Sequence, residues 1–184
     1  MAGSRGAQSP TVTSGLDLSH PLLHRPGHAL PSNPQAPQRQ QTYLRALETI
    51  PCLTVHLGHF LSHPARMPLA HSQRGWPPTV EVIKTEEKGS DVNLATYLLL
   101  DAFRRDCETA VVISHDSDLK EPIALVQKEL GIPVGVVNPH PAAHRSRALQ
   151  PAFFKQLRPS VLPACQFPDV LQDARGMIRK PVDW

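Results

Sequence analysis

Residues 109–119 read Thr-Ala-Val-Val-Ile-Ser-His-Asp-Ser-Asp-Leu, and this stretch decides the fold. Its first half, residues 109–114, is a continuous apolar run, which is typical of a parallel strand covered on both faces. Its second half places Asp116 and Asp118 directly after that strand, where the next helix opens. Ligands of open α/β sheets bind at the carboxyl ends of the strands, so both carboxylates should face a crevice.

Strand and helix patterns alternate on both sides of this stretch, which predicts an α/β domain with a mainly parallel sheet. Residues 62–78 carry four prolines and predict a loop, and residues 86–89 predict a turn. Ser90 is expected to cap the helix that follows, and Gly131 to end the later one. The expected helices are 38–50, 91–105 and 118–130, and the expected strands are 53–60, 80–84, 109–114 and 133–137.

The two ends of the chain have weaker patterns. Residues 1–35 contain five prolines among Gly, Ser and His, which predicts an extension that is disordered or not native to the domain. Residues 36–158 form the expected domain, with a basic helix over 142–158 at its end. Residues 159–184 are expected to pack on the domain as a C-terminal tail.

Composition narrows the function classes only a little. The chain has 184 residues and a net charge of +3, which permits a nucleic-acid partner without requiring one. Three cysteines with no CxxC pair argue against a disulfide framework or a zinc knuckle, and the cytoplasm is the simplest compartment. No stretch reaches the ~18 apolar residues of a membrane span, and the first residues do not form a signal peptide.

A third carboxylate, Asp91, begins another expected helix after another expected strand. Three carboxylates at one sheet edge repel one another, and a hard cation such as Mg²⁺ or Mn²⁺ removes that cost. Such a cation can activate water and neutralise charge on a phosphodiester. The alternative is N-capping, in which Asp116 or Asp118 caps the helix beside it and Asp91 faces the dipole of its own helix.

Two motifs resemble those of the NYN domain family, which is related to the PIN-domain ribonucleases. They are Lys88-Gly-Ser-Asp-Val-Asn-Leu-Ala95 and Ser114-His-Asp-Ser-Asp-Leu119, and the resemblance covers roughly residues 36–140. It implies a three-layer α/β/α PIN-like fold and Mg- or Mn-dependent hydrolysis of RNA. It also implies that Asp91, Asp116 and Asp118 are the catalytic and metal-binding acids, and that Asn93 and Ser114 orient ligands or backbone.

Other residues near these motifs have two readings each. His115 lies inside the acidic motif and would contact a substrate phosphate or assist proton transfer, or it is a variable loop residue. Lys88 and other basic residues would contact the phosphates of a single-stranded RNA, or they are ordinary solvated charges. Asp101 is expected on the solvated surface first and as an auxiliary acid second.

The family pattern begins with an apolar strand that ends in an aspartate, and residues 1–35 contain no such strand. Asp17 is the only acid there. The loss predicts weaker metal binding and lower activity. A misplaced start site or a truncated or divergent gene is favoured over a non-catalytic relative, and none of the three is excluded.

Two functions therefore stand. The first is a metal-dependent endoribonuclease that loss of the first strand impairs. The second is a non-catalytic RNA-binding or protein-interaction module. Self-association is left open for both.

Overall fold

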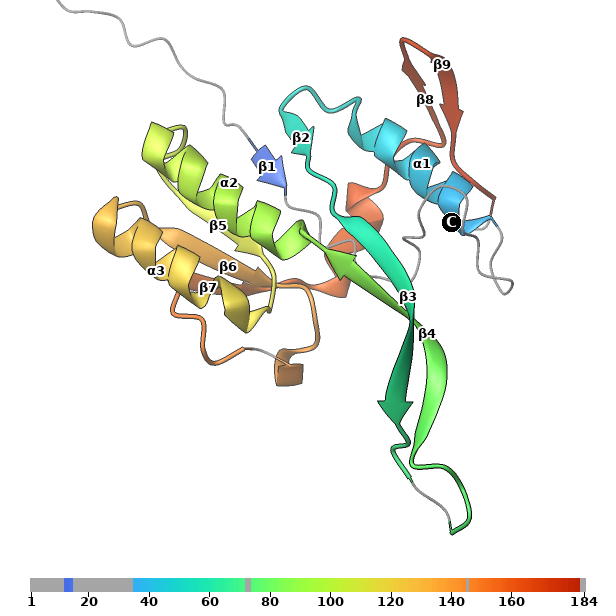
Figure 1. The fold of residues 1–184 in the computed structure, drawn as a ribbon. Helices are drawn as coiled ribbons and strands as arrows, with labels where there is room; N and C mark the ends of the chain where they lie inside the picture. Colours follow the sequence, from blue (N-terminus) through green and yellow to red (C-terminus); the bar gives the residue numbers. More distant parts are fainter. Residues whose placement is uncertain (1–11, 15–34, 72–73, 145, 183–184) are drawn as a thin grey trace, which may run out of the picture.

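A computed structural model describes residues 12–14, 35–71, 74–144 and 146–182 of the chain, and its fold is mixed α/β (Figure 1). The helices are α1 (Ala36–Leu47), α2 (Ser90–Arg104), α3 (Lys120–Glu129) and the 3-10 turns η1 (Ser117–Leu119), η2 (Ala142–His144) and η3 (Pro159–Cys165). The strands are β1 (Val12–Ser14), β2 (Leu53–Val55), β3 (His59–Pro68), β4 (Thr79–Lys88), β5 (Ala110–Ile113), β6 (Val134–Asn138), β7 (Phe153–Gln156), β8 (Val170–Asp173) and β9 (Gly176–Arg179).

The core lies between two helices and one face of the parallel sheet β5-β6-β7. Val112 of β5 is opposite Val136 of β6, and both side chains point toward the helices. Alternation along a strand sends every second side chain to the same face, so Val134 joins them. The buried cluster is completed by α2 and α3, and its members are Ala102, Val112, Leu119, Ile123, Val126, Ile132, Val134, Val136 and Leu149.

The opposite face of β5 is open to solvent. Val111 is 52% exposed and Ile113 is 58% exposed, so the prediction that this strand is covered on both faces is wrong. β5 is the edge strand of its sheet, and α2 and α3 pack against the face that carries Val112. The apolar run identified the strand correctly, but it could not show how many layers cover the strand.

A long antiparallel ribbon replaces the loop expected over residues 62–78. β3 runs from His59 to Pro68 and pairs with β4 through ten residue positions, from His59 opposite Lys88 to Pro68 opposite Thr79. Proline is tolerated in β3 because this strand pairs on one side only. β4 also continues through the residues expected to form a turn, and the chain bends only at Gly89, whose φ is +100°. The ribbon projects away from the rest of the molecule (Figure 1).

One short strand, β1, falls inside the segment that was expected to be irregular. It pairs in parallel with β2, with Val12 opposite Leu53. That expectation is corrected for these three residues, while Asp17 lies outside the described residues. β1 joins β2 and not β5, so it does not enter the sheet that carries the acidic turn.

The basic helix expected over residues 142–158 does not form. Among the described residues of that stretch, 142–144 and 146–158, only η2 is helical, and residues 153–156 instead form β7, the third parallel strand. The backbone N–H of Ala152 donates to the carbonyl of Val134 and starts this pairing. Consecutive aromatic residues, Phe153 and Phe154, suit a pleated surface better than a helix.

The C-terminal hairpin β8-β9 is held on α1 by charge and aromatic contacts. Asp173 accepts hydrogen bonds from Arg45 at 2.8 and 3.0 Å, and Tyr43 meets Phe167 edge to face. The hydrogen bond from Arg45 is the main reason that the pKa of Asp173 falls to about 2, and Arg175 adds to it. Arg45 and Asp173, which lie 128 positions apart in the sequence, are thus held together by hydrogen bonds.

The sheets are therefore parallel only in part. β1-β2 and β5-β6-β7 are parallel, whereas β3-β4 and β8-β9 are antiparallel. Among the helices of the described segments, none has the length and apolar character needed to span a bilayer.

Candidate functional site

The acidic turn follows β5 directly and is closed by its own side chains. The backbone N–H of Asp116 donates to Ser114 Oγ at 3.1 Å, and the N–H of Asp118 donates to Asp116 Oδ1 at 2.9 Å. Ser114 is buried, Asp116 is half-buried and Asp118 is exposed. The capping alternative thus holds for Asp116, which caps η1. A carboxylate has two oxygens, so this cap leaves acceptor capacity for a ligand.

Asp91 comes from the neighbouring element. It is exposed in the first turn of α2, and α2 packs against η1. The acids therefore belong to two elements that contact each other. Within the described part of the chain, however, no three His, Cys, Asp or Glu side chains lie close enough together to hold a metal ion.

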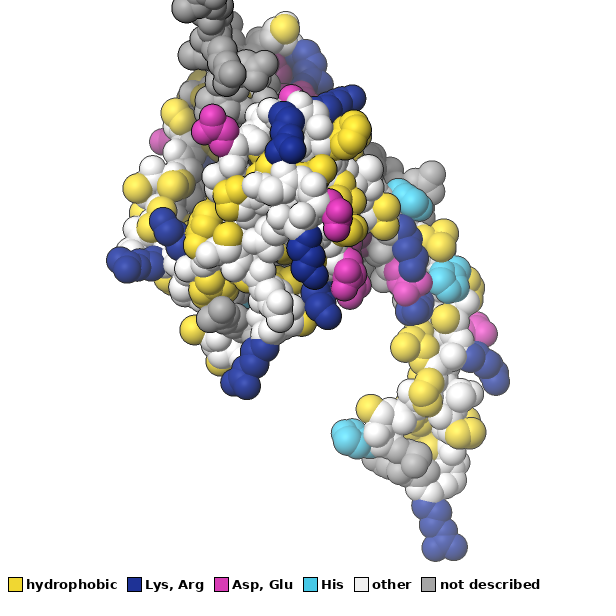
Figure 2. Space-filling view, turned by 90° about the vertical axis from the view of Figure 1, so that its left-hand side faces the viewer, with side chains coloured by type: hydrophobic (Ala, Val, Ile, Leu, Met, Phe, Trp, Pro, Cys, Tyr) yellow, Lys and Arg dark blue, Asp and Glu magenta, His cyan; other side chains and the backbone are white. Residues whose placement is uncertain are grey.

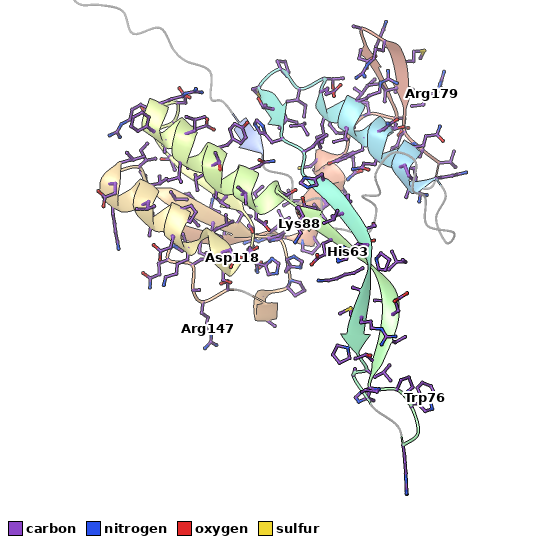
Figure 3. All side chains as sticks on the ribbon, in the orientation of Figure 1. His63, Trp76, Lys88, Asp118, Arg147 and Arg179 are labelled. Atoms are coloured by element: carbon purple, nitrogen blue, oxygen red, sulfur yellow. The ribbon has the colours of Figure 1, made fainter. Side chains whose placement is uncertain are left out.

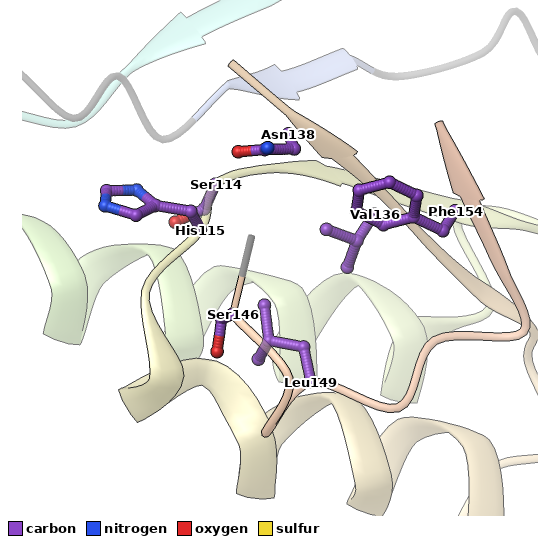
Figure 4. Close-up of a pocket in the computed structure, with 7 residues that line it drawn as sticks. All are labelled: Ser114, His115, Val136, Asn138, Ser146, Leu149 and Phe154. Atoms are coloured by element: carbon purple, nitrogen blue, oxygen red, sulfur yellow. The ribbon is translucent and has the colours of Figure 1, made fainter. Parts of the chain in front are cut away.

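Two imidazoles lie beside the acidic turn. The rings of His115 and His140 have centroids 4.0 Å apart and are tilted by 52°. His115 follows β5 and His140 follows β6, so the pair spans the carboxyl ends of two parallel strands. His115 also lines a small pocket with Ser114 and Asn138, in which apolar side chains form the opposite wall (Figure 4).

A buried amide network holds His140 in place. Asn138 is 1% exposed, its Nδ2 donates to the carbonyl of His140 at 3.0 Å and to Gln156 Oε1 at 2.9 Å, and its Oδ1 accepts from the N–H of His140. Gln156 Nε2 donates to the same His140 carbonyl. The strand expected over residues 133–137 stops just before Asn138, and the sequence predicts no role for this residue. The missed signal was a polar amide placed at the end of a fully apolar strand and before a proline.

A basic residue, Lys88, lies at the root of the ribbon, three positions before Asp91 in the sequence. Lys88 is the last residue of β4, its Nζ lies 3.6 Å from Glu86 Oε2, and half of its side chain is exposed. Glu86 is also 2.7 Å from Lys84, and the hydrogen bond from Lys84 is the largest of the causes that lower its pKa. The positive charge of Lys88 is thus only partly compensated.

Ser90 does not cap α2 as expected. Its Oγ donates to Glu87 Oε1 at 2.8 Å, its N–H donates to the same oxygen at 3.2 Å, and Gly89 occupies the capping position. The hydroxyl of Ser90 is therefore bonded to Glu87 of the preceding strand and not to a backbone N–H of α2. The positive end of the helix dipole also stabilises a negatively charged side chain at this position.

Asn93 contacts the chain segment that joins β2 to β3. Its Nδ2 donates to the carbonyl of Leu57 at 3.3 Å, and nearby the ring of His56 stacks on Tyr97 of the same helix with centroids 3.4 Å apart. Through these contacts, the segment that joins β2 to β3 packs against α2. Asn93 therefore contacts backbone in this structure, and its role in ligand binding stays a prediction.

Together, the fold and the acidic turn define a mixed α/β domain in which Asp116 and Asp118 lie at the carboxyl end of the parallel strand β5. Residues 38–156 match the family model of the NYN domain, and the chain belongs to the NYN domain family. This membership confirms the resemblance that the two motifs carry. It associates the chain with nuclease-like, RNA-related function.

Two individual proteins are similar to parts of the chain. One is the 6-hydroxy-3-succinoylpyridine 3-monooxygenase HspA of Pseudomonas putida (strain DSM 28022 / S16), which is 30% identical over 110 residues. That match covers 57% of this chain and 35% of the relative, so the chain spans about a third of its length. The other is a crystal structure of a protein of unknown function, VPA0982, from Vibrio parahaemolyticus RIMD 2210633. It has 15% identity and a TM-score of 0.44, and the match covers 71% of this chain and 65% of that one.

Proposed function

We propose that the chain is a metal-dependent endoribonuclease that hydrolyses RNA phosphodiester bonds at the edge formed by Asp91, Asp116 and Asp118. The observation that carries this proposal is the pair of acids in the turn after β5, beside the His115–His140 pair. Family membership supports RNA as the substrate class.

The donor chemistry of the edge fits a magnesium or manganese ion. Carboxylate oxygens are the ligands that these hard cations prefer, and Mg²⁺ is commonly held by one or two carboxylates together with substrate phosphates. Asp118 is exposed, and Asp116 keeps one oxygen beyond its cap. When bound, the ion would lower the pKa of a water and neutralise phosphate charge. Because the described acids form no three-ligand group, we expect metal affinity to be weak without RNA.

The remaining residues have separate roles in this proposal. His115 and His140 donate hydrogen bonds to a phosphate oxygen, since a ring N–H beside a phosphate forms a charge-assisted bond. Lys88, at the root of the ribbon, attracts the phosphate backbone of the RNA. Ser114 keeps the acidic turn closed by accepting from the amide of Asp116.

The test is single-turnover cleavage of a single-stranded RNA with Mg²⁺ or Mn²⁺. Asp116→Asn removes the charge but keeps an oxygen that can cap η1, so the fold should survive while cleavage falls by at least about 100-fold, equivalent to about 2.7 kcal/mol of transition-state stabilisation. Asp91→Asn should have the same effect. Asp169→Asn, an exposed acid just before β8, is the matched control. Full activity in both site variants would refute the proposal.

The second candidate is a non-catalytic RNA-binding NYN module. The absence of a three-ligand group among the described side chains favours it. It predicts that the purified chain binds RNA and cleaves none with either metal at any enzyme concentration. Binding that survives Asp116→Asn without any cleavage by the unaltered chain would select this candidate.

A further inference from the structure

The projecting ribbon β3-β4 has an unusual charge pattern. Residues 59–80 contain no Asp or Glu at all, yet they include Arg66, Arg74 and three histidines. The acids of β4 lie nearer the root: Glu86 is paired with Lys84 and Lys88, and Glu87 accepts from Ser90. The outer part of the ribbon therefore presents positive or neutral groups only, apart from Glu81, which faces Arg66 across the two strands.

The far end of the ribbon carries an aromatic side chain beside a cation. Trp76 is 61% exposed, and Arg74 is exposed two positions before it. Figure 3 places Trp76 at the far end of the ribbon and Lys88 at its root. Figure 2 shows the ribbon standing clear of the body, with a Lys or Arg side chain at its tip. A flat ring and a guanidinium are the two groups with which proteins hold unpaired bases and their phosphates.

The ribbon is also connected to the acidic edge by a short, defined path. β4 ends at Lys88, Gly89 turns the chain, and Asp91 lies in the first turn of α2. Ten paired positions at a rise of about 3.4 Å per residue place the tip roughly 30 Å from that turn. A strand of RNA at the acids would meet the tip only if it extended well beyond the reacting phosphate.

We propose that the β3-β4 ribbon is an arm that binds single-stranded RNA, with Trp76 stacking on a base and Arg74 contacting a backbone phosphate. The arm extends the RNA contact away from the acidic edge and makes affinity depend on RNA length. This inference rests on the proposed function, which identifies RNA as the ligand that binds at Asp116. Charge favours RNA over a protein partner, because a surface with Arg66 and Arg74 and with Glu81 as its one acid is complementary to a polyanion.

The experiment measures RNA binding in EDTA, where no cleavage can occur. Fluorescence anisotropy is recorded with labelled single-stranded RNAs of about 6 and about 20 nucleotides, which bracket the usual site sizes of single-strand binders. Trp76→Ala should weaken binding of the longer RNA at least about fivefold, the lower limit of a lost stacked base, and leave the shorter RNA unaffected. Trp76→Phe should restore most of the affinity, and Arg74→Ala should reduce the dependence on salt.

Phe103→Ala is the matched control, because Phe103 is 72% exposed on α2 and lies outside the ribbon. Equal affinities of the Trp76→Ala and unaltered chains for the longer RNA would overturn the inference. So would a Trp76→Ala chain with a lower mass in sedimentation, because the tip would then be a contact between copies of this chain.

Failure of this inference is distinguishable from failure of the proposed function. If Trp76→Ala weakens binding of the longer RNA while the unaltered chain cleaves no RNA, the arm stands and the nuclease proposal falls. If short RNA is cleaved in an Asp116-dependent manner while Trp76→Ala changes nothing, the nuclease proposal stands and the arm falls.

Discussion

Asn138 should contribute far more to stability than an amide side chain at the surface such as Gln127. Its side chain makes three hydrogen bonds in a site that is 1% exposed, and two of them fix the turn that carries His140. Each such bond contributes about 0.5–1.5 kcal/mol net, so Asn138→Ala should cost about 3 kcal/mol. Gln156 keeps its own bond to the His140 carbonyl, which limits the loss.

The assay is urea unfolding followed by circular dichroism, with m held in common between variants. Gln127→Ala is the control: this amide donates one solvent-exposed bond, to the carbonyl of Gln150, and its loss should cost about 0.5 kcal/mol. A cost for Asn138→Ala below about 1 kcal/mol, or equal to that of Gln127→Ala, would refute the reasoning.

A second substitution separates hydrogen bonding from shape. Asn138→Asp keeps the size and the oxygen that accepts from His140, but it replaces the Nδ2 donor with an oxygen that faces the oxygens of His140 and Gln156. The buried carboxyl should have a raised pKa in the folded state, because burial and facing oxygens disfavour its charged form. The stability of the Asn138→Asp variant relative to the unaltered chain should therefore increase as pH falls and the carboxyl becomes protonated. The relative stability of Asn138→Ala should not change in this way.

Three further predictions concern stability. Ile123→Ala, at a position 1% exposed in the core, should cost about 2–5 kcal/mol in urea unfolding, whereas Leu125→Ala on the same helix, 44% exposed, should cost about 1 kcal/mol or less; equal costs would contradict the assigned core. Gly131→Ala should cost about 1 kcal/mol by the same assay, because φ is +67° there and an L side chain is strained in that conformation. The pKa of Asp173 is depressed to about 2 from an ordinary 3.8, so the contribution of its carboxylate to stability is complete above about pH 4 and is lost as pH falls toward 2. The melting temperatures of Asp173→Asn and the unaltered chain should therefore converge over that interval. A constant difference between them would rule out the Arg45–Asp173 ion pair as the source of the stability difference.

The sequence alone determined the central βαβ unit and the place of the acids within it. The apolar runs at β5 and β6, the helical spacing in α2 and α3, and Gly131 after α3 are local signals, because strand and helix periods are set by residues near one another. The motifs around Asp91 and Asp116 were sufficient to identify the family.

Only the tertiary structure decided what lies on each side of those elements. Whether β5 is covered on one face or two depends on distant segments, and so does the pairing that turns a proline-containing stretch into β3. The same is true of Asn138, whose role is visible only when Gln156 from another strand comes beside it. Propensity and periodicity describe a segment by itself, whereas burial and pairing are properties of the partners that the chain brings to it.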